Sequence, residues 1–231
     1  MTPELAYKRL VEGNKRFVAG LKSVDSMPTH DRRKELAEHG QRPFAMVLCC
    51  ADSRAPAELI FDAGLGELFV CRVAGNIVAP SLIASLEFAA TAFGPQVCVI
   101  LGHTQCGAVK AGINAAETGQ PGPTDHIHDL LREIRPAVYK AKDSNPHAHH
   151  DFETLVAREN ILMSGKNLLD RSRVLRDLVD QGKLGMAGAL YDLHTGSVEW
   201  LDRPIRADLA PLPPLKTSSS RIVDTVPRRG L

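Results

Sequence analysis

Two uncharged, mostly apolar runs stand out in the hydrophobic pattern of this chain. They cover residues 44–49 and 97–101, and neither alternates apolar with polar positions. Such continuous apolar runs are typical of parallel strands that are covered on both faces. A third strand is predicted over residues 67–73, followed by a Gly75–Asn76 turn. The pattern therefore predicts an α/β fold with a mainly parallel central sheet.

Helical periodicity fills most of the chain between these strands. Further helices are expected over residues 31–39, 56–62, 80–93, 108–117, 125–142 and 152–181. A hairpin over residues 185–201 is expected at the sheet edge, because its two apolar segments flank a His-Thr-Gly turn. Flanking helices and an edge hairpin complete the predicted α/β architecture.

The first helix is predicted over residues 4–20, with Thr2 as N-cap and Pro3 at the first helical position. One face carries the apolar stripe Ala6, Leu10, Gly13 and Phe17, and the other face is charged. A polar loop separates this helix from the first strand, so we expect an arm that packs across a dimer.

One domain is predicted for residues 1–206, of which residues 1–40 form the helical arm. Residues 207–231 are rich in proline and serine and are expected to form a disordered tail.

Charge and composition narrow the possible partners and the compartment. The 28 Lys and Arg residues balance 27 Asp and Glu residues, and no basic stripe interleaves with aromatic residues, so nucleic acid is not expected. The longest apolar stretch, residues 82–93, is broken by Glu87 and is shorter than the roughly 20 residues that span a bilayer. No secretory signal is recognised, and five cysteines are an odd number for a disulfide framework. We therefore expect a cytoplasmic protein with no membrane partner.

Reactive side chains follow two of the predicted strands. Cys50, Asp52 and Arg54 come after the first apolar run, and His103 and Cys106 come after the second. Ligands of open α/β sheets bind outside the carboxyl ends of the strands, so these side chains could share one pocket. Two thiolates and one imidazole form a zinc-binding set that leaves one coordination position open.

A purely structural interpretation remains possible, because free cysteines are often small buried hydrophobic residues. It would make His103 a hydrogen-bonded core residue, but it leaves Asp52 and Arg54 unexplained. Cys71 and Cys98 lie within predicted strands and are assigned to the core. Cys49 and Cys50 are ambiguous, since only one of two neighbouring strand residues can face the pocket. The cluster His147, His149 and His150 is expected to be solvated.

Three motifs together resemble the β-class carbonic anhydrases. They are Cys-Ala-Asp-Ser-Arg at 50–54, Gly-Glu-Leu-Phe-Val-Cys-Arg-Val-Ala-Gly-Asn at 66–76 and Gly-His-Thr-Gln-Cys-Gly-Ala-Val at 102–109. The resemblance extends over residues 4–202. It implies four parallel strands with an edge strand, and a homodimer or tetramer.

The resemblance also implies one zinc ion per chain, bound by Cys50, His103 and Cys106. It places an Asp52–Arg54 pair beside the metal, and it selects Cys50 over Cys49 as the ligand. Asp52 is itself a competent metal ligand, and Arg54 is expected to hold its carboxylate away from the zinc.

Substrate-pocket positions are implied at Gln41, Phe69 and Phe88, and the Gly75 turn brings backbone close to the same pocket. A second branch of the family has a bicarbonate-inhibition pocket with a tryptophan three residues before the first ligand. Val47 stands at that position here, so the inhibitory pocket is not expected.

The function implied is reversible hydration of carbon dioxide, a small-molecule substrate, by a zinc-bound hydroxide. A carbon disulfide or carbonyl sulfide hydrolase could use the same site. A third alternative is a non-catalytic zinc-binding module, or a thiol sensor that uses Cys49 and Cys50.

Overall fold

The computed structural model describes residues 1–144 and 151–206. The predicted tail at 207–231 and the histidine cluster at 147–150 lie outside the described residues.

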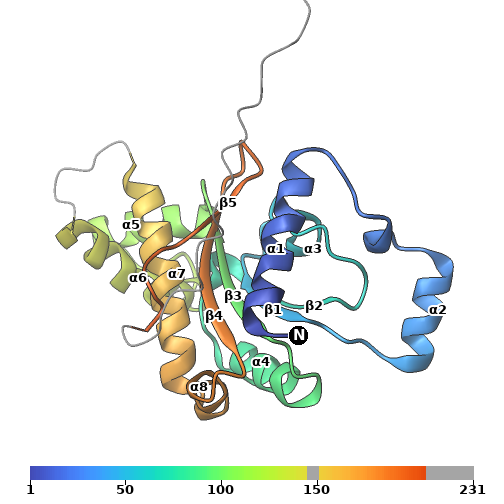
Figure 1. The fold of residues 1–231 in the computed structure, drawn as a ribbon. Coiled ribbons are helices and arrows are strands. Elements are labelled where there is room, and N and C mark those ends of the chain that lie inside the picture. The colour runs from blue at the N-terminus through green and yellow to red at the C-terminus, as the bar shows by residue number, and fades with distance from the viewer. Residues whose placement is uncertain (145–150, 207–231) are drawn as a thin grey trace, which may run out of the picture.

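A five-stranded sheet runs through the centre of the molecule (Figure 1). Its strands are arranged in the order β2-β1-β3-β4-β5, of which the first four are parallel and β5 is antiparallel to β4. The prediction of a mainly parallel sheet with an edge hairpin is therefore confirmed. The strands are β1 (Ala45–Cys49), β2 (Leu68–Arg72), β3 (Val97–His103), β4 (Gly185–Tyr191) and β5 (Val198–Trp200).

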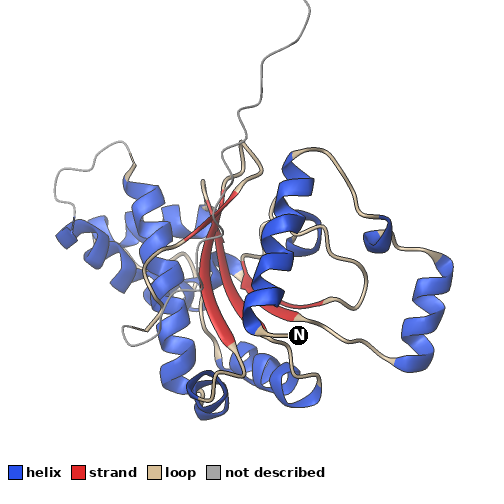
Figure 2. Ribbon diagram, viewed as in Figure 1, coloured by secondary structure: helices blue, strands red, loops and turns tan. Residues whose placement is uncertain are grey.

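Helices cover both faces of the sheet, as Figure 2 shows. Every residue of β1 and β3 is buried, because successive side chains enter two different apolar cores. Met46 and Leu48 face one core, whereas Val47 and Cys49 face the other. This two-sided burial explains why the strands show no alternation of apolar and polar residues.

The predicted helices are present, with one division. They are α1 (Pro3–Val18), α2 (His30–His39), α3 (Ala57–Ile60), α4 (Pro80–Ala92), α5 (Gly107–Thr118), α6 (Asp125–Ser144), α7 (Phe152–Arg171) and α8 (Arg173–Asp180), with short 3-10 turns η1 (Val24–Ser26) and η2 (Ala74–Asn76).

The segment predicted as one helix over 152–181 is divided at Ser172. This residue has an extended backbone and is fully buried, and its side chain accepts a hydrogen bond from the Leu175 N–H. It also donates a hydrogen bond of 2.6 Å to Glu87 in α4. An N-cap residue starts a new helix at this point because its own backbone is not helical.

Helix α1 packs on its own chain. Ala6 and Leu10 are fully buried, and the Tyr7 ring lies 4.6 Å from the Trp200 ring in β5. The Asn14 side chain donates hydrogen bonds to the carbonyls of Ile60 and Gly196. The apolar stripe of this helix is therefore covered by residues of the same chain in this structure, and packing of the arm across a dimer stays a prediction. The loop after α1 is long enough for the helix to fold back over α3 and the edge hairpin.

None of the helices in the described part of the chain combines the length and the apolar character needed to cross a membrane.

Candidate metal centre

Three side chains converge at the carboxyl edge of the sheet. Cys50 directly follows β1, His103 is the last residue of β3, and Cys106 is the N-cap of α5. One ligand atom from each residue lies within 4.8 Å of the others, and all three residues are buried. Neighbouring parallel strands end at the same edge, so the pairing of β1 with β3 brings these groups together.

The geometry of His103 is suited to metal coordination. Its Nδ1 lies 2.8 Å from the Thr104 carbonyl, and donation to that oxygen leaves Nε2 with a free lone pair. Nε2 is buried and makes no hydrogen bond to any described residue. The nearest carboxylate oxygen, Asp52 Oδ2, is 3.9 Å away. A buried acceptor without a partner is costly, and a metal ion at this position would remove that cost.

Backbone N–H groups stabilise negative charge on both sulfurs. Cys50 Sγ accepts hydrogen bonds of 3.4 Å from the N–H groups of Asp52 and Gly75. The pKa of Cys106 is raised overall by its hydrogen bond with Cys50 and by burial. Hydrogen bonds from the backbone N–H groups of Val109 and Ala108 act in the opposite direction and favour the thiolate. Thiolates held in this way are good ligands for zinc, and two sulfurs with one nitrogen form a set that leaves a fourth position open.

The two thiols titrate as a coupled pair. Their sulfurs are 3.9 Å apart, and a hydrogen bond from Cys106 lowers the pKa of Cys50 below its usual range. In the metal-free protein one thiolate therefore forms readily, whereas the second proton is retained. Binding of a metal ion would release that proton, so metal affinity should rise with pH.

Cys49 points away from this group. It is fully buried in the opposite apolar core, and burial raises the pKa of its thiol to about 12. The ambiguity between Cys49 and Cys50 is thereby resolved in favour of Cys50. A thiol sensor built on both residues is poorly supported, because Cys49 is neither accessible nor ionised.

Arg54 binds the Asp52 carboxylate through both oxygens. Its Nε lies 2.9 Å from Oδ1 and its Nη2 lies 2.6 Å from Oδ2, and the Arg54 N–H also donates to Oδ1. These contacts hold the pKa of Asp52 well below its usual range. Asp52, which was predicted as a possible ligand, is thus bound to Arg54 and lies outside the three-residue group.

Arg72 is a site residue that the sequence analysis missed. This last residue of β2 donates from Nε to the Cys50 carbonyl at 3.0 Å and from Nη2 to the Asp52 carbonyl at 2.6 Å. It therefore fixes the turn that carries both side chains. The available signal was a charged residue at the end of a strand that pairs with β1, since Arg72 is in register with Cys49.

The predicted substrate positions Gln41, Phe69 and Phe88 lie away from the candidate metal centre of their own chain. Phe69 is in register with Met46, four residues before the first ligand, which is about 13 Å along a strand. Its ring is 6.5 Å from that of Phe88, which is 57% exposed on α4. Gln41 precedes the amino end of β1 and is exposed. Of the four predicted positions, only Gly75 contacts the candidate metal centre, through its bond to Cys50.

A small cavity of about 260 Å³ lies beside the Asp52–Arg54 pair. It is lined by Arg54, Gln105, Leu193 and His194. The last two residues follow β4, and the Leu193 N–H donates a hydrogen bond to the Thr104 hydroxyl. The turn after β4 therefore forms one wall of this cavity, a role that its sequence did not indicate.

Comparison with known proteins identifies similar sequences and similar folds. A family model described as carbonic anhydrase matches residues 45–198. Carbonic anhydrase 2 of Mycobacterium tuberculosis is 36% identical over 194 residues, covering 84% of this chain and 90% of that protein. A carbonic anhydrase of Mycolicibacterium smegmatis is 34% identical over 202 residues, covering 85% of this chain and 92% of its own length.

Solved structures show the same fold. The β-carbonic anhydrase CcaA superimposes with a TM-score of 0.68 at 27% identity, covering 84% of this chain and 94% of that chain. A tetrameric β-carbonic anhydrase of the filamentous ascomycete Sordaria macrospora gives a TM-score of 0.64 at 22% identity, covering 73% of this chain and 85% of that chain.

Proposed function

Because this chain belongs to the β class of the carbonic anhydrase family, we propose that it catalyses the reversible hydration of carbon dioxide to bicarbonate and a proton. The observation that carries the proposal is the buried group of Cys50, His103 and Cys106, in which His103 Nε2 has no other partner among the described residues. These three residues would hold one zinc ion per chain.

Zinc, when bound, lowers the pKa of a coordinated water from 15.7 to about 7 and so supplies a nucleophile near neutral pH. The Asp52 carboxylate, whose pKa is held low, would accept a hydrogen bond from that water and so help to orient it toward carbon dioxide. Arg54 acts on Asp52 itself, because it grips both carboxylate oxygens and keeps them from closing onto the metal. The backbone donors to Cys50 and Cys106 reduce the negative charge that the two thiolates present, which favours ionisation of the water.

A catalytic centre agrees better with this donor set than a structural one. Structural zinc sites are closed by a fourth protein ligand, whereas here the nearest further candidate, Asp52, is already paired with Arg54. The cavity beside Arg54, of about 260 Å³, is large enough for a molecule of the size of carbon dioxide.

The proposal is tested by measuring zinc content and stopped-flow carbon dioxide hydration on the same preparation. We expect one zinc per chain and a rate that falls to the uncatalysed value when a chelator removes the metal. A protein that binds zinc but does not accelerate hydration would refute the proposal. Turnover of carbon disulfide, without hydration of carbon dioxide, would identify the hydrolase instead.

We further propose a homodimer or tetramer, which would complete the substrate pocket. Gln41, Phe69 and Phe88 are distant from the metal ligands of their own chain, so they could line a pocket only in an assembly that brings them to another copy's site. Helix α2 has no buried residue, and Figure 1 shows it set apart from the sheet.

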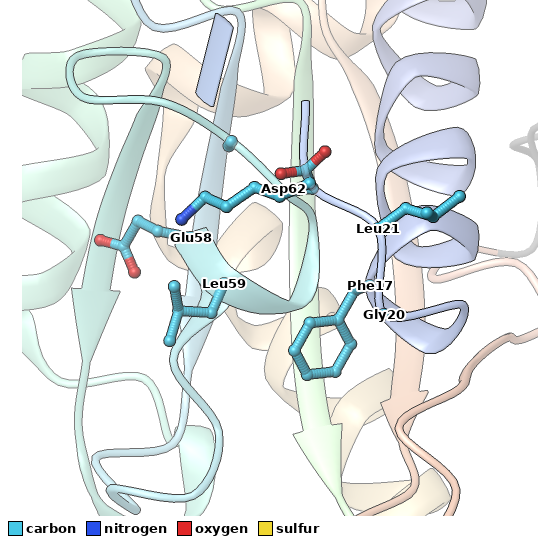
Figure 3. A pocket seen from close by; sticks show the side chains of 8 residues that line it. Phe17, Gly20, Leu21, Glu58, Leu59 and Asp62 are labelled. Carbon is cyan, nitrogen blue, oxygen red and sulfur yellow. The ribbon is translucent and has the colours of Figure 1, made fainter. Parts of the chain in front are cut away.

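An apolar surface beside the helical arm of residues 1–40 is a candidate for the interface between subunits. A pocket of about 300 Å³ lies between the end of α1 and α3 (Figure 3), and Leu21 and Leu59 at its edge are 63% and 53% exposed. Leu59→Asp should lower the mass measured by light scattering, because a buried charge disrupts an apolar interface. The control Val174→Asp changes a residue that is 38% exposed on α8 and should leave the mass unchanged. An unchanged mass in both variants would exclude this surface.

We also propose that residues 1–206 form one domain that works in the cytoplasm. Its five cysteines are free and buried, which fits a reducing compartment.

A further inference from the structure

Asn160 is a buried polar residue on α7 that contacts the Gly75 turn beside the candidate metal centre. The residue is only 1% exposed, and its helix packs against β3 and the η2 turn. Its Nδ2 donates a hydrogen bond of 2.7 Å to the carbonyl of Gly75. An amide buried to this extent is costly unless it has a specific partner, and Gly75 is that partner.

Gly75 links Asn160 to the metal ligand Cys50. Its N–H donates to Cys50 Sγ at 3.4 Å, so one residue accepts from Asn160 and donates to the sulfur. Its φ of +69° is a left-handed conformation that favours glycine. A Cβ at this position would also lie 2.8 Å from Ile134 Cδ1, so α6 confines the turn from another side.

We propose that Asn160 is a positioning residue for zinc binding, which acts by holding the Gly75 turn so that its N–H points at Cys50 Sγ. This inference rests on the proposed zinc site. Partners of this kind orient ligands and tune the charge they donate, and their loss typically costs about 10- to 100-fold in metal affinity. Without Asn160 the Gly75 carbonyl loses its donor and the turn can rotate, which weakens the N–H···S bond.

Asn14 provides a matched control elsewhere in the fold. It is also a buried asparagine, 6% exposed, whose Nδ2 donates to backbone carbonyls, at Ile60 and Gly196. It joins α1 to α3 and the edge hairpin and contacts none of the three ligands. Its Oδ1 also accepts a hydrogen bond from the Val198 N–H, so a variant there loses more hydrogen bonds than an Asn160 variant without touching the candidate metal centre.

The test compares Asn160→Leu with Asn14→Leu in the full chain. Leucine is close to asparagine in size but has no amide, so in each case a backbone carbonyl loses its partner. We expect both variants to lose thermal stability. Zinc alone, titrated against a chromophoric chelator, should bind Asn160→Leu about 10-fold more weakly or worse, and Asn14→Leu with an affinity within about twofold of wild type.

Cobalt substitution adds a readout that general loosening of the fold would not move. A thiolate that loses an N–H donor becomes richer in electrons, so the sulfur-to-cobalt charge-transfer band of Asn160→Leu should shift to lower energy. The band of Asn14→Leu should stay at the wild-type position. Should Asn160→Leu fail to fold, Asn160→Ser gives the same comparison, because its short hydroxyl cannot span the distance to the Gly75 carbonyl.

Equal zinc affinities and equal cobalt spectra in the folded Asn160 variants and wild type would overturn the inference while leaving the zinc site intact. Failure of wild-type protein to bind zinc would instead refute the proposed function itself. Equal losses of affinity in the Asn160 and Asn14 variants would show that Asn160 acts only through overall stability.

Discussion

The guanidinium of Arg54 holds both carboxylate oxygens of Asp52, at 2.9 Å from Nε and 2.6 Å from Nη2. Arg54 also donates to the Gln105 carbonyl at 3.2 Å, in the segment between His103 and Cys106. One side chain thus joins the turn that follows β1 to the turn that follows β3. Under the proposed mechanism, this pairing would decide whether Asp52 assists the reaction or closes onto the metal.

Removing the Arg54 side chain should therefore abolish activity without loss of zinc. We expect Arg54→Ala to retain zinc but to lose about 100-fold or more in hydration rate near neutral pH, because Asp52 is free to coordinate the metal. Zinc analysis, stopped-flow rates and X-ray absorption would show this. Arg54→Lys should recover only part of the rate, since an ammonium cannot bind both oxygens. A near-normal rate in Arg54→Ala would mean that Arg54 serves only to pack the turn.

Substitution of single cysteines should separate ligands from core residues. We expect Cys106→Ser to lose zinc and activity, whereas Cys98→Ser keeps both. Cys98 is fully buried in β3 and does not belong to the group of Cys50, His103 and Cys106 whose ligand atoms converge, so it is no candidate ligand. Metal analysis after dialysis, with a thermal melt for each variant, makes the comparison. Equal zinc loss in the two variants would refute the ligand assignment.

The hydrogen bonds from Arg72 to the carbonyls of Cys50 and Asp52 lead to a prediction about the turn that follows β1. Arg72→Gln cannot reach both the Cys50 and Asp52 carbonyls, so we expect zinc affinity or hydration activity to fall about 10- to 100-fold. The control Arg173→Gln changes a side chain that is 85% exposed on α8 and should have no effect. Wild-type affinity and rate in a folded Arg72→Gln protein would show that backbone pairing alone fixes the turn.

The buried carboxylate of Asp62 predicts how stability depends on pH. Burial acts to raise its pKa, but hydrogen bonds from Ser26, Arg16 and the Ser23 N–H outweigh burial and hold the pKa below its ordinary value. A carboxylate with a lowered pKa stabilises the fold above the unfolded value of about 4, and this contribution is lost as the pH falls below it.

Asp62→Asn should accordingly lower the free energy of unfolding by about 2 kcal/mol at neutral pH, because it leaves Arg16 without its partner. The difference from wild type should shrink below about pH 4. Urea titrations at several pH values measure both effects. Asp170→Asn, in an exposed pair with Lys166, should cost almost nothing. A difference that is independent of pH would contradict the ionised role of Asp62.

The sequence by itself determined the sheet, its two covered faces and the three candidate ligands. Each of these follows from local order: an apolar run predicts a buried strand, and the residue after a parallel strand must lie at the ligand-binding edge. His103, Cys106 and the short-range pair of Asp52 and Arg54 were therefore identifiable from their positions in the chain, whereas the choice of Cys50 over Cys49 came from the family resemblance.

Only the tertiary structure decided which distant residues support that edge. The link from Asn160 to Gly75 spans 85 positions, and the register of β2 with β1 brings Arg72 to the Cys50 turn. No hydrophobic period encodes such contacts, because they depend on how a helix docks and how strands align. The same holds for α1: its apolar stripe showed that it must pack, but only the three-dimensional fold revealed that the surface it covers belongs to its own chain.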